Sequence, residues 1–184
     1  PAEYKQRSFT MKTMKNKIII LIALFVFSFV VLISPAYSVN IGTCGYLISS
    51  PGTYDVTANL NLDSVNNTCI MVGASNVTID CHNYLLDGDP TRTGTRTLTF
   101  GVVIASGVAR SNFTIKNCRV RGFDNGINLG NMSRDILVLN NTAFESNTGM
   151  HSPGSSNVSF YNNTAYNNSK YGITNINGKK YTLI

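Results

Sequence analysis

The sequence predicts an all-β solenoid, built from short coils that stack on one another. Three observations predict it: a phrase recurs every 22 to 23 residues, apolar and polar residues alternate within each copy, and Gly, Asn, Thr and Val are frequent. Alternation with a period of two is typical of strands with one buried face. Each copy has only two or three apolar residues to bury, so we expect the copies to cover one another.

Three copies of the repeat align directly. They begin at residues 112, 135 and 157, and they read NFTIKNCRVRGFDNGI, DILVLNNTAFESNTGM and NVSFYNNTAYNNSKYGI. A glycine and an apolar residue end each copy at intervals of 23 residues: Gly126-Ile127, Gly149-Met150 and Gly172-Ile173. An earlier copy begins at Asn76, 36 residues before the next, so one loop is longer than the others.

The interval favours one kind of solenoid. Leucine-rich repeats have a similar length but need a recurring leucine framework, and helical repeats need about 30 residues or more. Short strands joined by tight corners fit a parallel β-helix, in which each coil advances about 4.8 Å. Residues 39–184 would form about six coils, with 39–75 as a cap and first coils and 76–184 as the regular repeats.

The first element is a predicted signal helix over residues 11–38. Three lysines precede an uncharged apolar run over 18–33, and the segment ends on Ala36-Tyr37-Ser38, a pattern typical of a secretory signal cleaved after Ser38. The run is shorter than the roughly 20 residues of a membrane span, and a retained anchor is the alternative. Residues 1–10 are interpreted as an upstream extension. We therefore expect a secreted or cell-surface protein, or a periplasmic one in a two-membrane bacterium.

The charge balance argues against nucleic-acid binding. The whole chain has a formal charge of +6, but five of its 15 basic residues and one of its nine acidic residues precede residue 39. The remainder has ten basic and eight acidic residues, a formal charge of +2. We expect no nucleic-acid partner, and contact with a membrane only through an uncleaved signal segment.

All four cysteines follow the predicted cleavage point, where oxidising conditions permit disulfides. Cys44 and Cys69 bracket the irregular cap, and we expect a bridge between them. Cys81 and Cys118 fall at nearly the same place in adjacent copies, so a second bridge is expected although the alignment puts them one residue out of step. There is no CxxC spacing, so we expect neither a metal nor a cofactor at the cysteines.

Asparagines mark the corner after the first strand of each copy. Asn117, Asn140 and Asn162 occupy equivalent positions, and asparagine adopts left-handed backbone angles more readily than other non-glycine residues. We expect a ladder of stacked asparagines here. A register shifted by one residue, at 118, 141 and 163, is the alternative.

Eight asparagines also satisfy the N-glycosylation pattern of Asn followed at the second position by Ser or Thr. We expect modification at the three that lie in predicted loops, Asn66, Asn131 and Asn167, and none at Asn140 and Asn162 in the ladder.

The phrases NVTIDCHNYLLDG, SNFTIKNCRVRGFDNGI and SSNVSFYNNTAYNNSKYGI resemble the repeats of right-handed parallel β-helix proteins. Such repeats occur in NosD-like proteins and in carbohydrate-binding and sugar-hydrolase-type modules, many of them secreted or archaeal surface proteins. The resemblance covers residues 44–173. It implies a fold rather than one chemistry, because the family includes lyases, hydrolases, epimerases, adhesins and scaffolds.

Catalytic candidates are sparse. Asp87 and Asp89 read as solvated turn acids before the insertion TRTGTRTLTFG. The alternative is that they line a polysaccharide groove together with Arg92 and Arg96. The nearest matches to polygalacturonase-type motifs, at 124–126 and 149–152, lack the paired carboxylates of glycoside cleavage.

Aromatic and sulfur side chains complete the candidates. Tyr161 follows a predicted inward Phe160, so we expect its ring to project outward, where it can stack on sugar rings. Phe144, Tyr166 and Tyr171 are candidates of the same kind. For all four, the alternative is an aromatic stack within the core. Met71, Met132 and Met150 with His151 could bind copper in a NosD-like protein, but we expect inward methionines to belong to the core.

The leading functional hypothesis is an exported, non-catalytic scaffold, adhesin-like or at the cell surface, that binds carbohydrate or neighbouring surface proteins. One alternative is a lyase or glycoside hydrolase with its site in residues 87–100 or in coils missing from this sequence. A second is a periplasmic copper-site maturation factor. Because the chain stops within a predicted further strand, at 179–184, we expect the repeats to be truncated.

Overall fold

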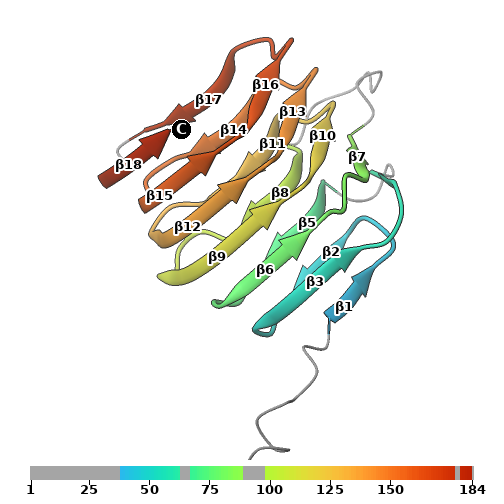
Figure 1. Cartoon of the computed structure of the whole chain (residues 1–184), viewed down its shortest axis with the longest axis horizontal. Helices are drawn as coiled ribbons and strands as arrows, with labels where there is room; N and C mark the ends of the chain where they lie inside the picture. The colour runs from blue at the N-terminus through green and yellow to red at the C-terminus, as the bar shows by residue number, and fades with distance from the viewer. Residues whose placement is uncertain (1–37, 63–66, 89–97, 177–178, 184) are drawn as a thin grey trace, which may run out of the picture. The chain divides into compact units, whose positions relative to one another are not determined.

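The computed structural model describes residues 38–62, 67–88, 98–176 and 179–183 (Figure 1). These residues form three parallel sheets and contain no helix. Among them, therefore, no helix is long and apolar enough to cross a membrane. The predicted signal helix lies outside the described residues.

We call the three sheets A, B and C. Sheet A has seven strands: β1 (Ser38–Ile41), β3 (Gly52–Val56), β6 (Val77–Asp80), β9 (Arg110–Lys116), β12 (Ser133–Leu139), β15 (Ser156–Tyr161) and β18 (Lys179–Leu183). Sheet B has six strands: β2 (Tyr46–Ile48), β5 (Thr68–Val72), β8 (Phe100–Ile104), β11 (Asn125–Asn128), β14 (Thr148–Ser152) and β17 (Tyr171–Asn175). Sheet C has five strands: β4 (Leu60–Asn61), β7 (Leu85–Asp87), β10 (Arg119–Arg121), β13 (Thr142–Phe144) and β16 (Thr164–Tyr166).

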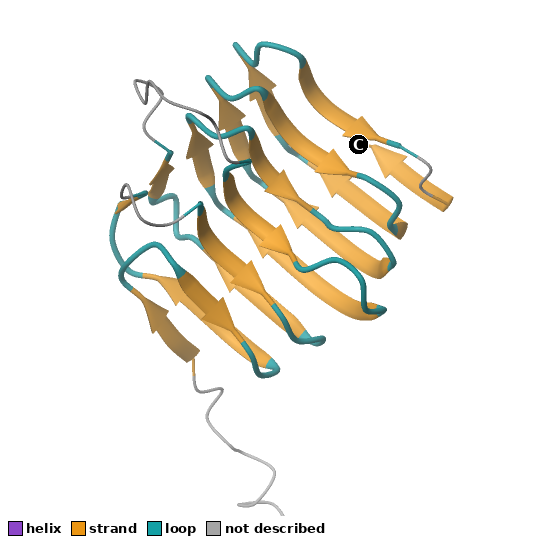
Figure 2. Cartoon of the chain, turned by 180° about the vertical axis from the view of Figure 1, so that it is seen from behind, coloured by secondary structure: helices purple, strands orange, loops and turns teal. Residues whose placement is uncertain are grey.

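The chain passes through sheets A, C and B in turn and then starts the next coil (Figures 1 and 2). The described residues contain five complete coils, from β3 to β17, with part of a coil on either side. This confirms the predicted parallel solenoid, and the regular repeats correspond to single coils. The pair Gly172-Ile173 lies within β17, and the strand expected at the end of the sequence is β18.

The apolar positions of the repeat form the core. Val77, Phe113, Ile136 and Val158 lie in register on four successive strands of sheet A, and each is almost completely buried. A second inward column runs parallel to it through Ile79, Ile115, Val138 and Phe160. Burying one such side chain contributes about 1.5–3 kcal/mol, so stacking supplies the stability that a single coil lacks.

Two rows of side chains form the corner after sheet A. The first of these rows consists of Asn117, Asn140 and Asn162, whose φ angles are 56°, 55° and 51°. The amide of Asn162 donates to the side-chain oxygen of Asn140 at 2.8 Å. Asparagine therefore provides both the left-handed turn and a contact between coils.

The neighbouring positions fill the inside of the same corner. The buried Asn141 accepts a hydrogen bond from the backbone N–H of Cys118 at 2.9 Å and donates to the Ile115 carbonyl at 2.9 Å. Its amide also donates to the side-chain oxygen of Asn163 at 3.0 Å. The two registers left open by the sequence are thus both used: Asn117, Asn140 and Asn162 make the left-handed turns, and the residues that follow them face the inside of the corner.

A further ladder precedes the strands of sheet A. The repeat starts Asn112, Asp135 and Asn157 have positive φ angles of 65°, 56° and 52°. Asn112 donates to Asn76 at 3.0 Å, and Asn157 donates to Asp135 at 2.7 Å. Asn76, Asn112 and Asn157 also satisfy the N-glycosylation pattern, so part of the frequency of that pattern reflects the backbone geometry of the repeat.

Both expected disulfides are present, Cys44–Cys69 and Cys81–Cys118. The first joins the turn before β2 to β5, within the predicted cap. In the second, Asp80 and Lys116 are paired in register, so Cys118 lies one residue further along its coil than Cys81. The Cα atoms of Cys81 and Cys118 are nevertheless 4.7 Å apart, within the range of a disulfide.

Candidate binding site on the outer face of sheet A

The outward side chains near the carboxyl ends of the sheet A strands form one continuous row. Each lies in register with the next, and together they define what we call the outer row: Asp55, Asp80, Lys116, Leu139 and Tyr161. Neighbouring strands are about 4.8 Å apart, so the row is roughly 19 Å long. One end is charged and the other is apolar.

Asp80 is the most firmly held member of the charged end. Its Oδ1 accepts hydrogen bonds from the Asn117 amide at 2.9 Å and from the backbone N–H of His82 at 3.0 Å. Its Oδ2 lies 2.9 Å from the Lys116 ammonium. Burial raises the pKa of Asp80, but these hydrogen bonds and the charge of Lys116 outweigh it, so the net pKa is lowered. Asp80 is therefore a carboxylate at neutral pH.

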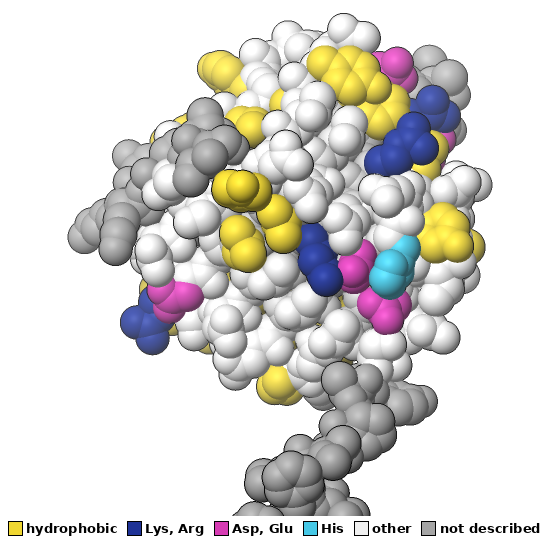
Figure 3. All heavy atoms as spheres, in the orientation of Figure 1, with side chains coloured by type: hydrophobic (Ala, Val, Ile, Leu, Met, Phe, Trp, Pro, Cys, Tyr) yellow, Lys and Arg dark blue, Asp and Glu magenta, His cyan; other side chains and the backbone are white. Residues whose placement is uncertain are grey.

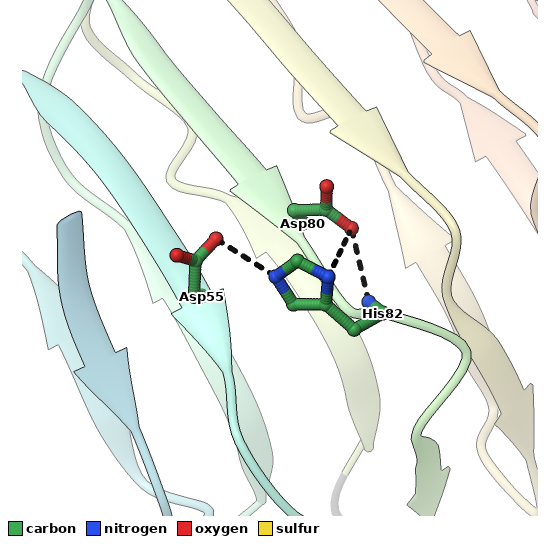
Figure 4. Close-up of side chains that lie close together, drawn as sticks. All are labelled: Asp55, Asp80 and His82. Carbon is green, nitrogen blue, oxygen red and sulfur yellow. Dashed lines mark hydrogen bonds and ion pairs between the residues drawn. The ribbon is translucent and has the colours of Figure 1, made fainter. Parts of the chain in front are cut away.

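His82 lies between two carboxylates (Figure 4). Its Nε2 is 3.1 Å from Asp55 Oδ1, and its Nδ1 is 3.7 Å from Asp80 Oδ1. His82 and Asn83 have φ angles of 46° and 64°, so two consecutive left-handed residues turn the chain here. Figure 3 shows a histidine flanked by two acidic side chains, with a basic side chain beside them.

The other end of the outer row is apolar. Tyr161 keeps 49% of its surface exposed, as the alternation in its strand predicted. The neighbouring Leu139 is half-buried, and Leu137, two residues earlier on the same face, is also exposed. This end therefore offers an aromatic ring beside aliphatic surface.

The remaining candidate aromatics lie on other sheets. Phe144 and Tyr166 stack with centroids 5.1 Å apart and planes at 7°, on the outer face of sheet C. Phe144 is buried, and the face of Tyr166 that stacks on it is hidden, so this pair is a poor platform for a sugar ring. Tyr171 is exposed on sheet B.

Asp87 is not a solvated turn acid; that interpretation is wrong. It ends strand β7, and its Oδ2 accepts hydrogen bonds from Arg121 Nε at 3.0 Å and Nη2 at 2.6 Å. The hydrogen bond and the charge of Asp87 raise the pKa of Arg121. Asp87 therefore connects two coils instead of opening a loop. The other members of the predicted groove, Asp89, Arg92 and Arg96, lie outside the described residues.

The alternative copper ligands are dispersed. Met150 is fully buried in the core, as expected, whereas Met71 projects from the outer face of sheet B and Met132 is exposed in the turn before β12. His151 lies on the outer face of sheet B, opposite to the side that Met150 faces. Asp124 in the polygalacturonase-like segment accepts hydrogen bonds from the Thr99 N–H at 3.0 Å and hydroxyl at 3.1 Å.

Two of the expected glycan acceptors are described. Asn131 and Asn167 are both exposed, and the side-chain oxygen of Asn131 accepts a hydrogen bond from the Gly107 N–H at 3.1 Å. Asn66 lies outside the described residues. Their modification remains a prediction.

A scan against protein-family models matched residues 47–184 to the family described as the right handed beta helix region. The chain belongs to the right-handed β-helix family. Searches among curated proteins and among solved structures found no significant match to this β-helix protein. Its two disulfides are consistent with an extracellular environment.

Sequence reasoning missed the cluster of Asp55, Asp80 and His82. Asp80 and His82 were visible only as scattered titratable residues, and Asp55 lies in a coil that lacks the repeat phrase. The one available signal was the period itself: residues one place after an inward position point outward, and in adjacent coils they lie side by side on the outer face. Applying that rule needs an alignment of the first coil, which its irregular sequence does not provide.

The stability of this β-helix protein should fall as the pH drops below about 6.5. Burial lowers the pKa of His151 from 6.5, and its Nδ1 has no hydrogen-bond partner among the described residues. The unfolded chain therefore binds this proton more readily, and protonation favours unfolding until the pH passes below the folded pKa. Asp80, whose pKa is lowered from 3.8, adds a further loss only in more acidic solution. The difference in free energy of unfolding between pH 7.5 and pH 5.5, measured by urea unfolding, should be smaller for His151→Gln than for the parent protein. An unchanged difference would contradict this explanation.

Proposed function

We propose that this β-helix protein is an exported, non-catalytic scaffold that binds an extended, neutral carbohydrate chain along the outer row. The observation that carries the proposal is the alignment of Tyr161 and Leu139 with the hydrogen-bonding groups of Lys116, Asp80 and Asp55 on one face. Sugar chains offer both apolar ring faces and hydroxyl groups, and the outer row offers a partner for each.

The shape of the face supports an extended ligand. The row crosses five parallel strands of one sheet, and it is roughly 19 Å long at about 4.8 Å per strand. Because the strands are held by ladder hydrogen bonds, the side chains are positioned before the ligand arrives, which reduces the entropy lost on binding. A chain lying across the strands would pass over all five positions.

The charges favour a neutral ligand. The row contains two carboxylates and one ammonium group, and the ammonium group of Lys116 is already 2.9 Å from Asp80. A polyanionic chain would approach the half-buried carboxylate of Asp55 without a free cation in the row to compensate. Hydroxyl groups can instead donate to the carboxylates at no such cost.

The test is a calorimetric titration with cellohexaose, mannohexaose and an oligogalacturonate. We expect binding to at least one neutral oligosaccharide, weakened roughly tenfold by Tyr161→Ala. Tyr171→Ala is the matched control, because this tyrosine belongs to the same coil and is 57% exposed, but on sheet B. Equal loss in both variants, or no binding by the parent protein, would overturn the proposal. New reducing ends or unsaturated products in the mixtures would overturn its non-catalytic part.

A further inference from the structure

We propose that Asp55 and His82 form an open site for a divalent transition-metal ion, with zinc as the ion that the site fits. The site lies at the charged end of the outer row, on the exposed side of sheet A (Figure 4). The metal site shares Asp55 with the proposed carbohydrate-binding row, but it does not need Tyr161 at the other end.

The distance between the two donor atoms suits a shared metal ion. His82 Nε2 and Asp55 Oδ1 are 3.1 Å apart. Zinc binds histidine nitrogen and carboxylate oxygen at about 2.0–2.2 Å, so two such ligands are about 2.9 Å apart at a right angle and about 3.4 Å apart in a tetrahedron. The observed separation lies between these values, so an ion can enter with little movement of either side chain.

The other side of the imidazole is arranged as in many metal-binding histidines. Asp80 Oδ1 is 3.7 Å from His82 Nδ1, opposite the proposed metal (Figure 4). This distance is too long for a hydrogen bond, but the negative charge behind the ring still favours the tautomer with its proton on Nδ1, which leaves Nε2 free for the metal. Asp80 is well placed for this role because its side chain is only 11% exposed and Asn117 and Lys116 hold it in place.

The backbone also fixes the ligand. The N–H of His82 donates to Asp80 Oδ1 at 3.0 Å, and the preceding residue, Cys81, is joined by its disulfide to Cys118 in the next coil. Asp55 lies inside strand β3, between the buried Tyr54 and Val56. Both ligands thus project from elements that the core holds, which limits the entropy lost when they bind an ion.

The donor types and the exposure define the kind of ion and the strength of the site. One imidazole nitrogen with carboxylate oxygen suits zinc and its neighbours, whereas calcium and magnesium prefer oxygen ligands alone. Asp55, Asp80 and Lys116 together carry a net charge of −1 when His82 is neutral, which favours a dication. The side chains of His82 and Asp55 are 51% and 25% exposed, so water can complete the coordination. Asn40, in register with Asp55 on β1, can supply an amide oxygen.

Titration of the untagged, oxidised protein with zinc chloride tests the site. We expect one zinc ion per chain, with affinity at least tenfold lower in both His82→Ala and the nearly isosteric Asp55→Asn. The chain has two histidines, so His151→Ala is the matched control and should bind zinc like the parent protein. Calcium chloride should give no binding in the same experiment.

No zinc binding up to about 1 mM, or unchanged affinity in both site variants, would overturn the proposal. So would a loss of binding in His151→Ala. Tyr161→Ala should leave zinc binding intact, so failure of the carbohydrate proposal and failure of the metal proposal can be told apart. Circular dichroism of each variant confirms that a loss of binding is not a loss of fold.

Discussion

Gly126→Ala should destabilise the protein by about 3 kcal/mol, because the added methyl group has no space between two coils. A Cβ at Gly126 would lie 2.6 Å from the carbonyl oxygen of Gly149 in the next coil. The same contact recurs along the stack: a Cβ at Gly101 would lie 2.5 Å from the Gly126 carbonyl oxygen, and one at Gly149 would lie 2.5 Å from the Gly172 carbonyl oxygen. The neighbouring atom is backbone held in a sheet, so it cannot move aside as a flexible side chain would.

Gly172→Ala provides the matched control for this prediction. Its Cβ would meet the Ala165 side chain at 3.3 Å as its closest contact and a carbonyl oxygen only at 3.8 Å. We expect a loss of less than about 1 kcal/mol there, and urea unfolding followed by far-ultraviolet circular dichroism measures both variants. Equal losses at the two positions would mean that glycine at Gly126 serves something other than close stacking.

Replacing Cys81 and Cys118 together by alanine should lower the free energy of unfolding by about 3–4 kcal/mol. The bridge closes a loop with a sequence separation of 37 residues, which includes the longest interval between repeats. Without the bridge, the unfolded chain regains the entropy of that loop, and the estimate for a loop of this length is close to 4 kcal/mol. Both cysteines are also fully buried, so the smaller side chains add a modest packing loss.

The measurement is urea unfolding of the parent protein and the double variant under oxidising conditions. Adding a reductant to the double variant then isolates the Cys44–Cys69 bridge, whose separation of 25 residues predicts a slightly smaller contribution. Coincident unfolding curves for the parent and the double variant would show that the bridge does not restrain the stack.

The solenoid could be predicted because the residues at equivalent positions of the repeat have the same structural role in every coil. The alternating pair Ile136 and Val138 matches Val158 and Phe160 at a fixed interval, and only vertical stacking buries both pairs. The corner asparagines were recognisable for the same reason. The glycines Gly126 and Gly149 were visible as part of the period. The close approach of a carbonyl oxygen from the next coil to each of them depends on how the coils stack, and the sequence of a single copy does not show it.

The contacts between irregular coils could not be predicted. Asp87 pairs with Arg121 across 34 residues, an interval lengthened by the insertion between β7 and β8, so the period gives no register there. Asp55 meets His82 across the first complete coil, whose sequence lacks the repeat phrase. Pairings of this kind depend on loop length and on individual rotamers, which alternation does not encode.

The most direct test of the proposed binding face is a nuclear magnetic resonance titration of the labelled protein with the neutral oligosaccharide that binds best. We predict that the amide shift changes cluster on sheet A around Lys116, Leu139 and Tyr161, and spare Tyr171 on sheet B and Tyr166 on sheet C. Changes confined to sheet B or sheet C would contradict the assignment of the outer row as the carbohydrate-binding surface.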